Sequence, residues 1–118
     1  MKSIRLEKIN SLLREEIGYI IQRDLKDPRI GFVSVLEVRT SPDLREARVF
    51  VSIFADEENK RKTIKGLKSA SGFIHKEIKG RLRLRTIPNI IFEMDDSIEK
   101  GAHILELIDK ISREEKIE

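Results

Sequence analysis

The hydrophobic period of this chain changes several times along its length, which restricts the folds that it can adopt. In residues 3–25 the apolar side chains recur every three to five positions, and this spacing predicts an amphipathic helix with one buried face. Asp27-Pro28 ends the helix, because proline disfavours helical backbone in the residue before it. Residues 32–40 and 46–55 are then rich in β-branched and aromatic residues, which predicts an antiparallel pair of strands.

Helical spacing returns after the strand pair. Asp56 opens an acidic run suited to a helix N-terminus, and apolar residues follow at helical spacing as far as Ile78. The small residues at 69–72 interrupt this spacing and predict a bend between two helices. The rest of the chain predicts a third strand at 86–96, a last helix at 97–111 and a frayed tail at 112–118.

These elements describe one α+β domain over residues 1–118, in which a three-stranded sheet is packed by helices in the order α-β-β-α-α-β-α. The third strand follows helices instead of a tight turn. It can therefore pair in parallel with one strand of the hairpin, which would make the sheet mixed. In the second strand, Val49 and Val51 are expected on one side of the sheet and Phe50 on the other. For Phe50 and Phe54, packing in the core is favoured over stacking on bases.

The sequence offers little chemistry for catalysis. Cysteine is absent, which excludes disulfides, thiolate nucleophiles and cysteine-ligated zinc. His75 and His103 lack the spacings that bring zinc ligands together, so both are interpreted as surface or packing residues. Asp95 and Asp96 are adjacent and would face opposite sides of a strand, which suits the end of a strand better than an acid–base pair. We therefore expect no catalysis, no cofactor and no metal.

Hydropathy predicts a cytoplasmic protein with no membrane partner. No window approaches the roughly 18 apolar residues that a membrane span needs. The N-terminal residues carry charges every few positions, unlike a signal peptide. Charged residues make up 38% of the chain, against about 25% in a typical soluble domain, a bias seen in thermophilic proteins.

The net charge of +3 hides a strong segregation. Residues 60–85 hold ten basic residues and one acidic residue, Glu77, for a net charge of +9, whereas residues 93–118 carry −5. A local excess of this size indicates one surface that faces a polyanion. The alternative is a solvated helix face whose charges neighbour the acidic C-terminal region.

The basic segment also supplies the candidate binding residues, because lysine and arginine contacts to phosphate provide most of the affinity for nucleic acid. The expected phosphate contacts are Lys65, Lys68, Lys76, Lys79, Arg81, Arg83 and Arg85, with Arg39 and Arg45, beside the hairpin turn, as second-rank candidates. The three arginines of the RLRLR run share one side only if that stretch is extended. Ser69, Ser71 and Gly72 complete the candidate RNA-binding residues and are expected to set the helix bend. For Gly72, close packing of the two helices is favoured over direct contact with RNA.

The order strand, strand, helix, break, helix, strand resembles a type II KH domain. Such domains carry GxxG between the paired helices, where backbone amides meet nucleotide phosphates. Here SASG at 69–72 keeps only the last glycine. That departure resembles the ribosome-binding factor A family, as do DPR at 27–29, SPDLREARVFVSIF at 41–54 and SASGFIHKEIKGRLRLRTIPNIIFEMDDSIEKGAHI at 69–104. The resemblance covers nearly the whole chain.

The resemblance implies a monomeric factor that assists late maturation of the small (30S) ribosomal subunit, with the free small subunit and 16S rRNA as partners. It also implies binding near the 5′-terminal helix of 16S rRNA, support of rRNA processing and cold adaptation, and no cofactor. The altered GxxG favours contact of the basic helices with structured rRNA. The alternatives are a generic nucleic-acid-binding domain, such as a DNA-binding regulator, and a protein-interaction module. In the latter, Glu99, Glu106 and Asp109 dock a ribosomal protein or an assembly GTPase.

Overall fold

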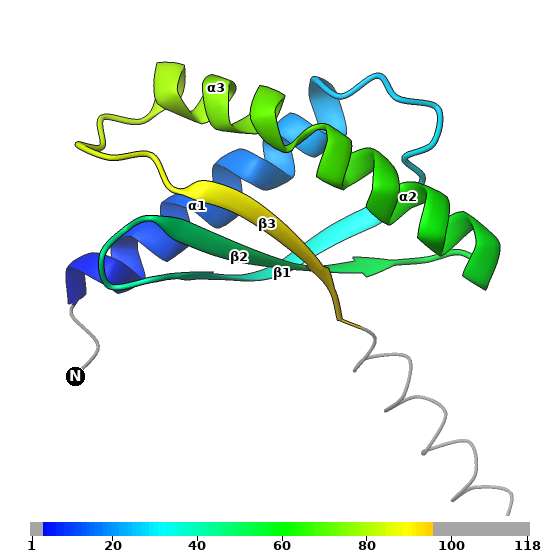
Figure 1. Cartoon of the computed structure of the whole chain (residues 1–118), viewed down its shortest axis with the longest axis horizontal. Helices are drawn as coiled ribbons and strands as arrows, with labels where there is room; N and C mark the ends of the chain where they lie inside the picture. Colours follow the sequence, from blue (N-terminus) through cyan, green and yellow to red (C-terminus); the bar gives the residue numbers. More distant parts are fainter. Residues whose placement is uncertain (1–3, 96–118) are drawn as a thin grey trace, which may run out of the picture.

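The computed structural model describes residues 4–95 and shows three helices and three strands (Figure 1). In chain order these elements are α1 (Ile4–Arg23), β1 (Val33–Thr40), β2 (Glu46–Ile53), α2 (Glu57–Ser69), α3 (Ser71–Arg81) and β3 (Asn89–Met94). The α+β class and the predicted order of these elements are confirmed. The predicted last helix, the tail and the acidic docking residues lie outside the described residues.

The sheet is mixed, as the order of elements allowed. Its strands lie in the order β1-β2-β3, with β1 antiparallel to β2 and β2 parallel to β3. A register shift between Val35 and Glu37 marks a bulge in β1. β3 begins at Asn89, later than predicted, because Pro88 has no N–H to join the ladder, whereas the Asn89 N–H donates to the Arg45 carbonyl at 2.9 Å.

All three helices lie on one face of the sheet (Figure 1). α1 packs against β1, and α2 and α3 pack against β3. The side chains of Val49 and Val51 point into this layer and are buried, as predicted, and Ile53 is buried as well. The buried apolar side chains of the described residues are Ile9, Leu13, Ile17, Ile20, Ile21, Val33, Val38, Ala47, Val49, Val51, Ile53, Leu67, Ile74, Ile78, Ile90 and Phe92.

The α2–α3 pair begins and bends where the sequence predicts. The Asp56 side chain caps α2 by accepting the Asn59 N–H at 2.8 Å, which satisfies a backbone donor that the helix leaves free. Only Ala70, itself in right-handed helical backbone, separates the end of α2 from the start of α3. Figure 1 shows the bend at this junction. The small-residue break therefore joins two helices, as expected.

The aromatic residues of the hairpin differ from the prediction. Phe54 is 53% exposed, so its expected place in the core is wrong, and Phe50 is only partly buried. Phe54 follows β2 and forms an edge-on pair with Phe32, with 5.9 Å between the ring centroids. For Phe50 the cause is tertiary: the helices cover the face of the sheet that holds Val49 and Val51, and the face of Phe50 has no helix in the described part of the chain.

Candidate nucleic-acid interface

A row of lysines runs along the outer side of α2 and α3. Lys65, Lys68, Lys76 and Lys79 are all exposed, and Gly72 lies between the two pairs. The spacings of three or four residues place them along one helix face. The row continues past the junction because Ala70 keeps helical backbone. Leu67, Ile74 and Ile78 occupy the inner side and are fully buried, which fixes the lysines toward solvent.

The lysine row (Lys65, Lys68, Gly72, Lys76 and Lys79) is free of acidic partners within residues 4–95, where none of its four ammonium groups forms an ion pair. The acidic residues of α2 stand in its first turn, and Glu77 of α3 turns toward Arg81 at 3.4 Å. Exposed cations that no carboxylate of the protein neutralises can interact with an external anion. The row is therefore well placed to meet phosphates.

Gly72 stands in open space. A Cβ built on this residue would meet no heavy atom within 4 Å, so close packing of the two helices does not explain the glycine. That favoured interpretation is wrong. The alternative, in which bare backbone lets a ligand approach the middle of the lysine row, is compatible with the geometry.

The close approach occurs at Gly66 instead, which sequence reasoning did not single out. Its α2 backbone lies against the loop that follows α1, so that an added Cβ would sit 2.8 Å from Ile30 Cγ1. One turn earlier, the Thr63 hydroxyl donates to the Arg29 carbonyl at 3.1 Å and accepts the Gly31 N–H at 3.3 Å. These contacts anchor α2 and so orient its lysines. A glycine inside a helical pattern was the only signal in the sequence.

Arg81 is held by the protein itself. The side chain is 29% exposed and contacts carboxylates of Asp24, Glu77 and Glu16, while its guanidinium lies 5.2 Å from the centroid of the Tyr19 ring. Burial works against the charged form, yet the three carboxylates raise the pKa of Arg81 above its ordinary value. The structure thus places this predicted phosphate contact in an ion-pair cluster between α3 and α1.

The RLRLR run does not share one conformation. α3 ends at Arg81 and Leu82 is extended, so the backbone changes within the run and Arg81 is separated from the two later arginines. Arg83 and Arg85 are exposed, and neither forms an ion pair with another described residue. His75 Nε2 lies 3.1 Å from the Ile87 carbonyl oxygen and ties this segment to α3. His75 is thus a partly buried packing residue, within the expected surface or packing role.

Arg39 and Arg45 are away from the lysine row. Arg39 lies on the face of the sheet opposite the helices, pairs with Glu37 at 2.9 Å and stands 5.3 Å from the Phe50 ring centroid. Arg45 stands just before β2, 3.8 Å from Asp43. The structure therefore does not bring these second-rank candidates together with the lysines.

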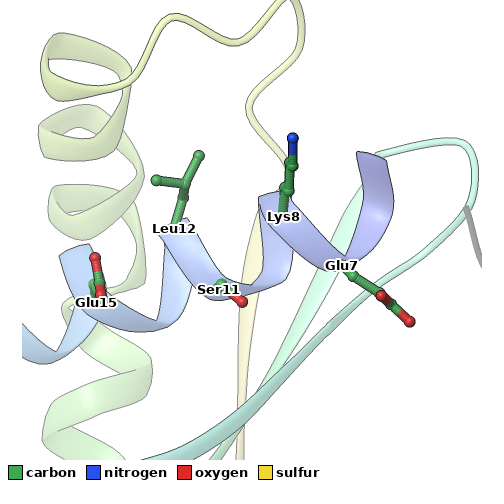
Figure 2. A pocket seen from close by; sticks show the side chains of 5 residues that line it. All are labelled: Glu7, Lys8, Ser11, Leu12 and Glu15. Carbon is green, nitrogen blue, oxygen red and sulfur yellow. The ribbon is translucent and has the colours of Figure 1, made fainter. Parts of the chain in front are cut away.

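A cavity on α1 offers no reactive centre. It measures about 410 Å³ and is open to solvent, and Figure 2 shows Lys8 and Leu12 on one side of the helix and Glu7 on the other. The remaining lining residues are Ser11 and Glu15. Within residues 4–95, no three histidine or carboxylate side chains gather as metal ligands. No helix in the same range is long and apolar enough to cross a membrane.

The order and pairing of the elements are those of a small type II KH-like domain. Nucleic-acid-binding members of that class clamp the nucleotide backbone with a GxxG loop between the paired helices. Residues 5–108 match the family profile described as ribosome-binding factor A. The chain is 47% identical over 116 residues to ribosome-binding factor A of Halothermothrix orenii, covering 98% of this chain and 95% of that protein. For the protein of the same name from Clostridium tetani the identity is 49%, over 98% of this chain and 96% of the relative. The chain belongs to the ribosome-binding factor A family.

Solved structures agree with this assignment. A crystal structure of ribosome-binding factor A from Thermus thermophilus matches with a TM-score of 0.67 and 27% identity, over 75% of this chain and 93% of that one. A solution structure of a putative ribosome binding factor A from Thermotoga maritima gives 0.60 and 31%, over 77% and 91%. A Thermus thermophilus homology model fitted into a cryo-EM map of a 30S–RbfA complex gives 0.61 and 28%, over 74% and 91%.

Proposed function

We propose that this protein binds the free small ribosomal subunit and contacts its rRNA through the outer face of α2 and α3. The single observation that carries the proposal is the lysine row, whose exposed ammonium groups have no acidic partner within residues 4–95. The family supports the choice of ligand, because the related Thermus thermophilus protein has been fitted into a map of a 30S complex. Arg83 and Arg85, which follow α3 in the chain, are exposed and add further positive charge. Arg81, although basic, contributes mainly by holding α3 to α1.

The partner RNA is 16S rRNA, and the binding region is the neck of the subunit near the 5′-terminal helix. The proposal follows the resemblance to the family in sequence and is compatible with a binding face made of phosphate contacts. Such a face reads the shape and position of the backbone and carries little sequence information. The protein acts in the cytoplasm as a monomer, without a cofactor and without catalysing a reaction.

The proposed mechanism is a shift in the population of rRNA conformers. A protein that binds one conformer more tightly than another favours it by the difference in binding free energy, and no nucleotide hydrolysis is required. The row holds an immature rRNA arrangement at a fixed spacing, because its four lysines project from two helices joined at one bend. When the RNA rearranges and the phosphates no longer match the row, affinity falls and the protein leaves. Processing of 16S rRNA ends then proceeds on the correctly folded subunit.

The test is a charge reversal on the row. Lys65→Glu, Lys68→Glu and Lys76→Glu, combined in one variant, should abolish co-sedimentation with free small subunits at moderate salt and leave the melting temperature unchanged, because all three side chains lie on the solvent side of the helices. The matched control reverses three basic residues of α1 in the same way: Arg5→Glu, Lys8→Glu and Arg14→Glu.

Whole ribosomes and large subunits complete the experiment. Retention of the wild type on free small subunits alone supports the proposal. Equal retention on all three particles indicates nonspecific binding to polyanions and overturns it. Undiminished binding of the lysine variant would show that the outer face of α2 and α3 is not the rRNA-binding face. Binding that requires the ribosomal proteins and vanishes with naked rRNA assigns the protein-interaction alternative instead.

A further inference from the structure

Phe73 is an aromatic residue that is not part of the hydrophobic core. It lies in the first turn of α3 and is 45% exposed, although the next residue, Ile74, is fully buried. Successive residues of a helix are rotated by about 100°, so the ring projects beside the core-facing side of α3 rather than into it. The side chain therefore presents a large apolar ring to solvent within the most basic part of the chain.

The surroundings of Phe73 leave its ring accessible. Lys76 lies three residues later on the same helix, and Gly72 and Gly80 carry no side chain to cover the ring. A Cβ at either glycine would meet no heavy atom within 4 Å, which means that both positions border open space. The ring thus lies beside the lysine row. The neighbouring surface is open, so a flat group can approach the ring without displacing other side chains.

Phe73 also differs from the other phenylalanines that are exposed or only partly buried. Phe32 and Phe54 stack edge-on against each other, and the Phe50 ring lies beneath guanidinium groups. Among residues 4–95, the Phe73 ring has no such aromatic or cationic partner. An exposed ring with neighbouring lysines is the combination that binds unpaired nucleotides, because bases stack on the ring while cations hold the backbone.

We propose that Phe73 stacks on an unpaired base of the RNA whose phosphates contact the lysine row. The inference rests on the proposed function and narrows its ligand to structured RNA with at least one unpaired base beside the bound phosphates. Stacking is tolerant of base identity, so the contact selects an unpaired base rather than a sequence. Gly72, one residue earlier, leaves room for the sugar–phosphate backbone between the ring and the lysines.

The test uses two RNA hairpins that differ only in one bulged 2-aminopurine nucleotide, with the full-length protein. Stacking on an aromatic ring quenches this fluorescent base. We expect the wild type to bind the bulged hairpin roughly 10-fold more tightly than the fully paired one, in line with the worth of one base–aromatic stack, and to quench its fluorescence. Phe73→Leu should remove both the preference and the quenching and leave binding of the paired hairpin unchanged. Phe73→Tyr should retain both.

Phe32→Leu is the matched control, because Phe32 is 73% exposed but lies outside α2 and α3. Loss of preference with Phe73→Leu alone supports the stacking contact. If Phe73→Leu behaves as the wild type on both hairpins while the three lysine reversals abolish binding, the stacking contact is wrong and the lysine face stands. If the wild type binds neither hairpin nor small subunits, the RNA-binding function itself fails, and this contact with it.

Discussion

Ile30 Cγ1 lies 2.8 Å from the point where a Cβ on Gly66 would stand. This approach seats the middle of α2 directly on the loop between α1 and β1, beside the hydrogen bonds of Thr63 to the same loop. The contact matters for function because α2 carries two residues of the lysine row, Lys65 and Lys68, on its other side. The conformation of the loop after the first helix thus sets the direction of the lysines that are proposed to contact phosphates.

Two glycine substitutions should separate folding from binding. We expect Gly66→Ala to lower the free energy of unfolding by about 1–3 kcal/mol, the usual cost of overpacking, because Ile30 would have to move. Gly72→Ala should instead leave stability unchanged or raise it by up to about 1 kcal/mol, since alanine favours the helix and the site is open. Chemical denaturation of both variants measures the two effects.

The same variants test the open space at Gly72. If a ligand uses that space, Gly72→Ala should weaken binding to small subunits while the protein remains fully folded. A fall in the stability of Gly72→Ala comparable with that of Gly66→Ala would contradict the assignment of Gly66 as the structural glycine.

Arg81 and Arg83 should differ although they are two residues apart. Arg81→Met should lower the melting temperature, because it leaves Asp24 and Glu16 without their cation and opens the contact between α3 and α1. The loss should shrink as salt is added, because salt screens the charges of these partly exposed groups. Arg83→Met should leave the melting temperature unchanged and weaken RNA binding. Thermal melts in low and high salt, with RNA titrations, distinguish them, and equal melting temperatures would refute the structural role of Arg81.

Thr63→Val tests the anchor of α2. The substitution keeps the shape of the side chain but removes its hydroxyl, so the Gly31 N–H and the Arg29 carbonyl both lose their partner. Leaving such groups unpaired in a part-buried place costs about 1–3 kcal/mol, and urea denaturation should show a loss in this range. Thr63→Ser, which restores the hydroxyl, should recover most of it. An unchanged unfolding midpoint for Thr63→Val would show that water replaces these bonds.

Stability should depend on pH through Asp27. Hydrogen bonds from the Arg29 side chain and from its backbone N–H lower the pKa of Asp27 below its ordinary value of 3.8. The folded state therefore gains stability from this group above pH 3.8 and loses it as the pH falls through the lowered pKa. Asp27→Asn should be less stable than the wild type at pH 7, and the difference should vanish in strong acid.

The control for the pH series is Glu46→Gln, which changes an exposed carboxylate that forms no ion pair with another described residue. Its stability should follow the wild type across the whole range. A gap between Asp27→Asn and the wild type that is as large in strong acid as at pH 7 would show that the charge of Asp27 is not the cause.

Local patterns in the sequence were enough to predict the described elements and the basic face. Periods of 3.6 and 2 residues decide which side chains can be buried together, so the apolar stripes of α1 and α2–α3 and the alternation in β2 predicted most of the core. Asp56 was predicted at a helix start because negative charge is favoured at the N-terminus of a helix, an effect confined to the first turn. The exposure of the lysines was predicted from the helical period, because their positions lie opposite the apolar positions of the same pattern.

The choice of partners across the fold was decided only by the tertiary structure. Arg81 and Arg83 look alike in the sequence, but only Arg81 meets carboxylates from α1 and the turn that follows it. Gly66 and Gly72 are both glycines in a helical pattern, and the loop after α1 selects the first as the close contact. Phe50 alternates with the buried valines of β2, yet it is only partly buried because the helices cover the other face of the sheet. Such differences arise between residues far apart in the chain, where no local period carries information about which groups will meet.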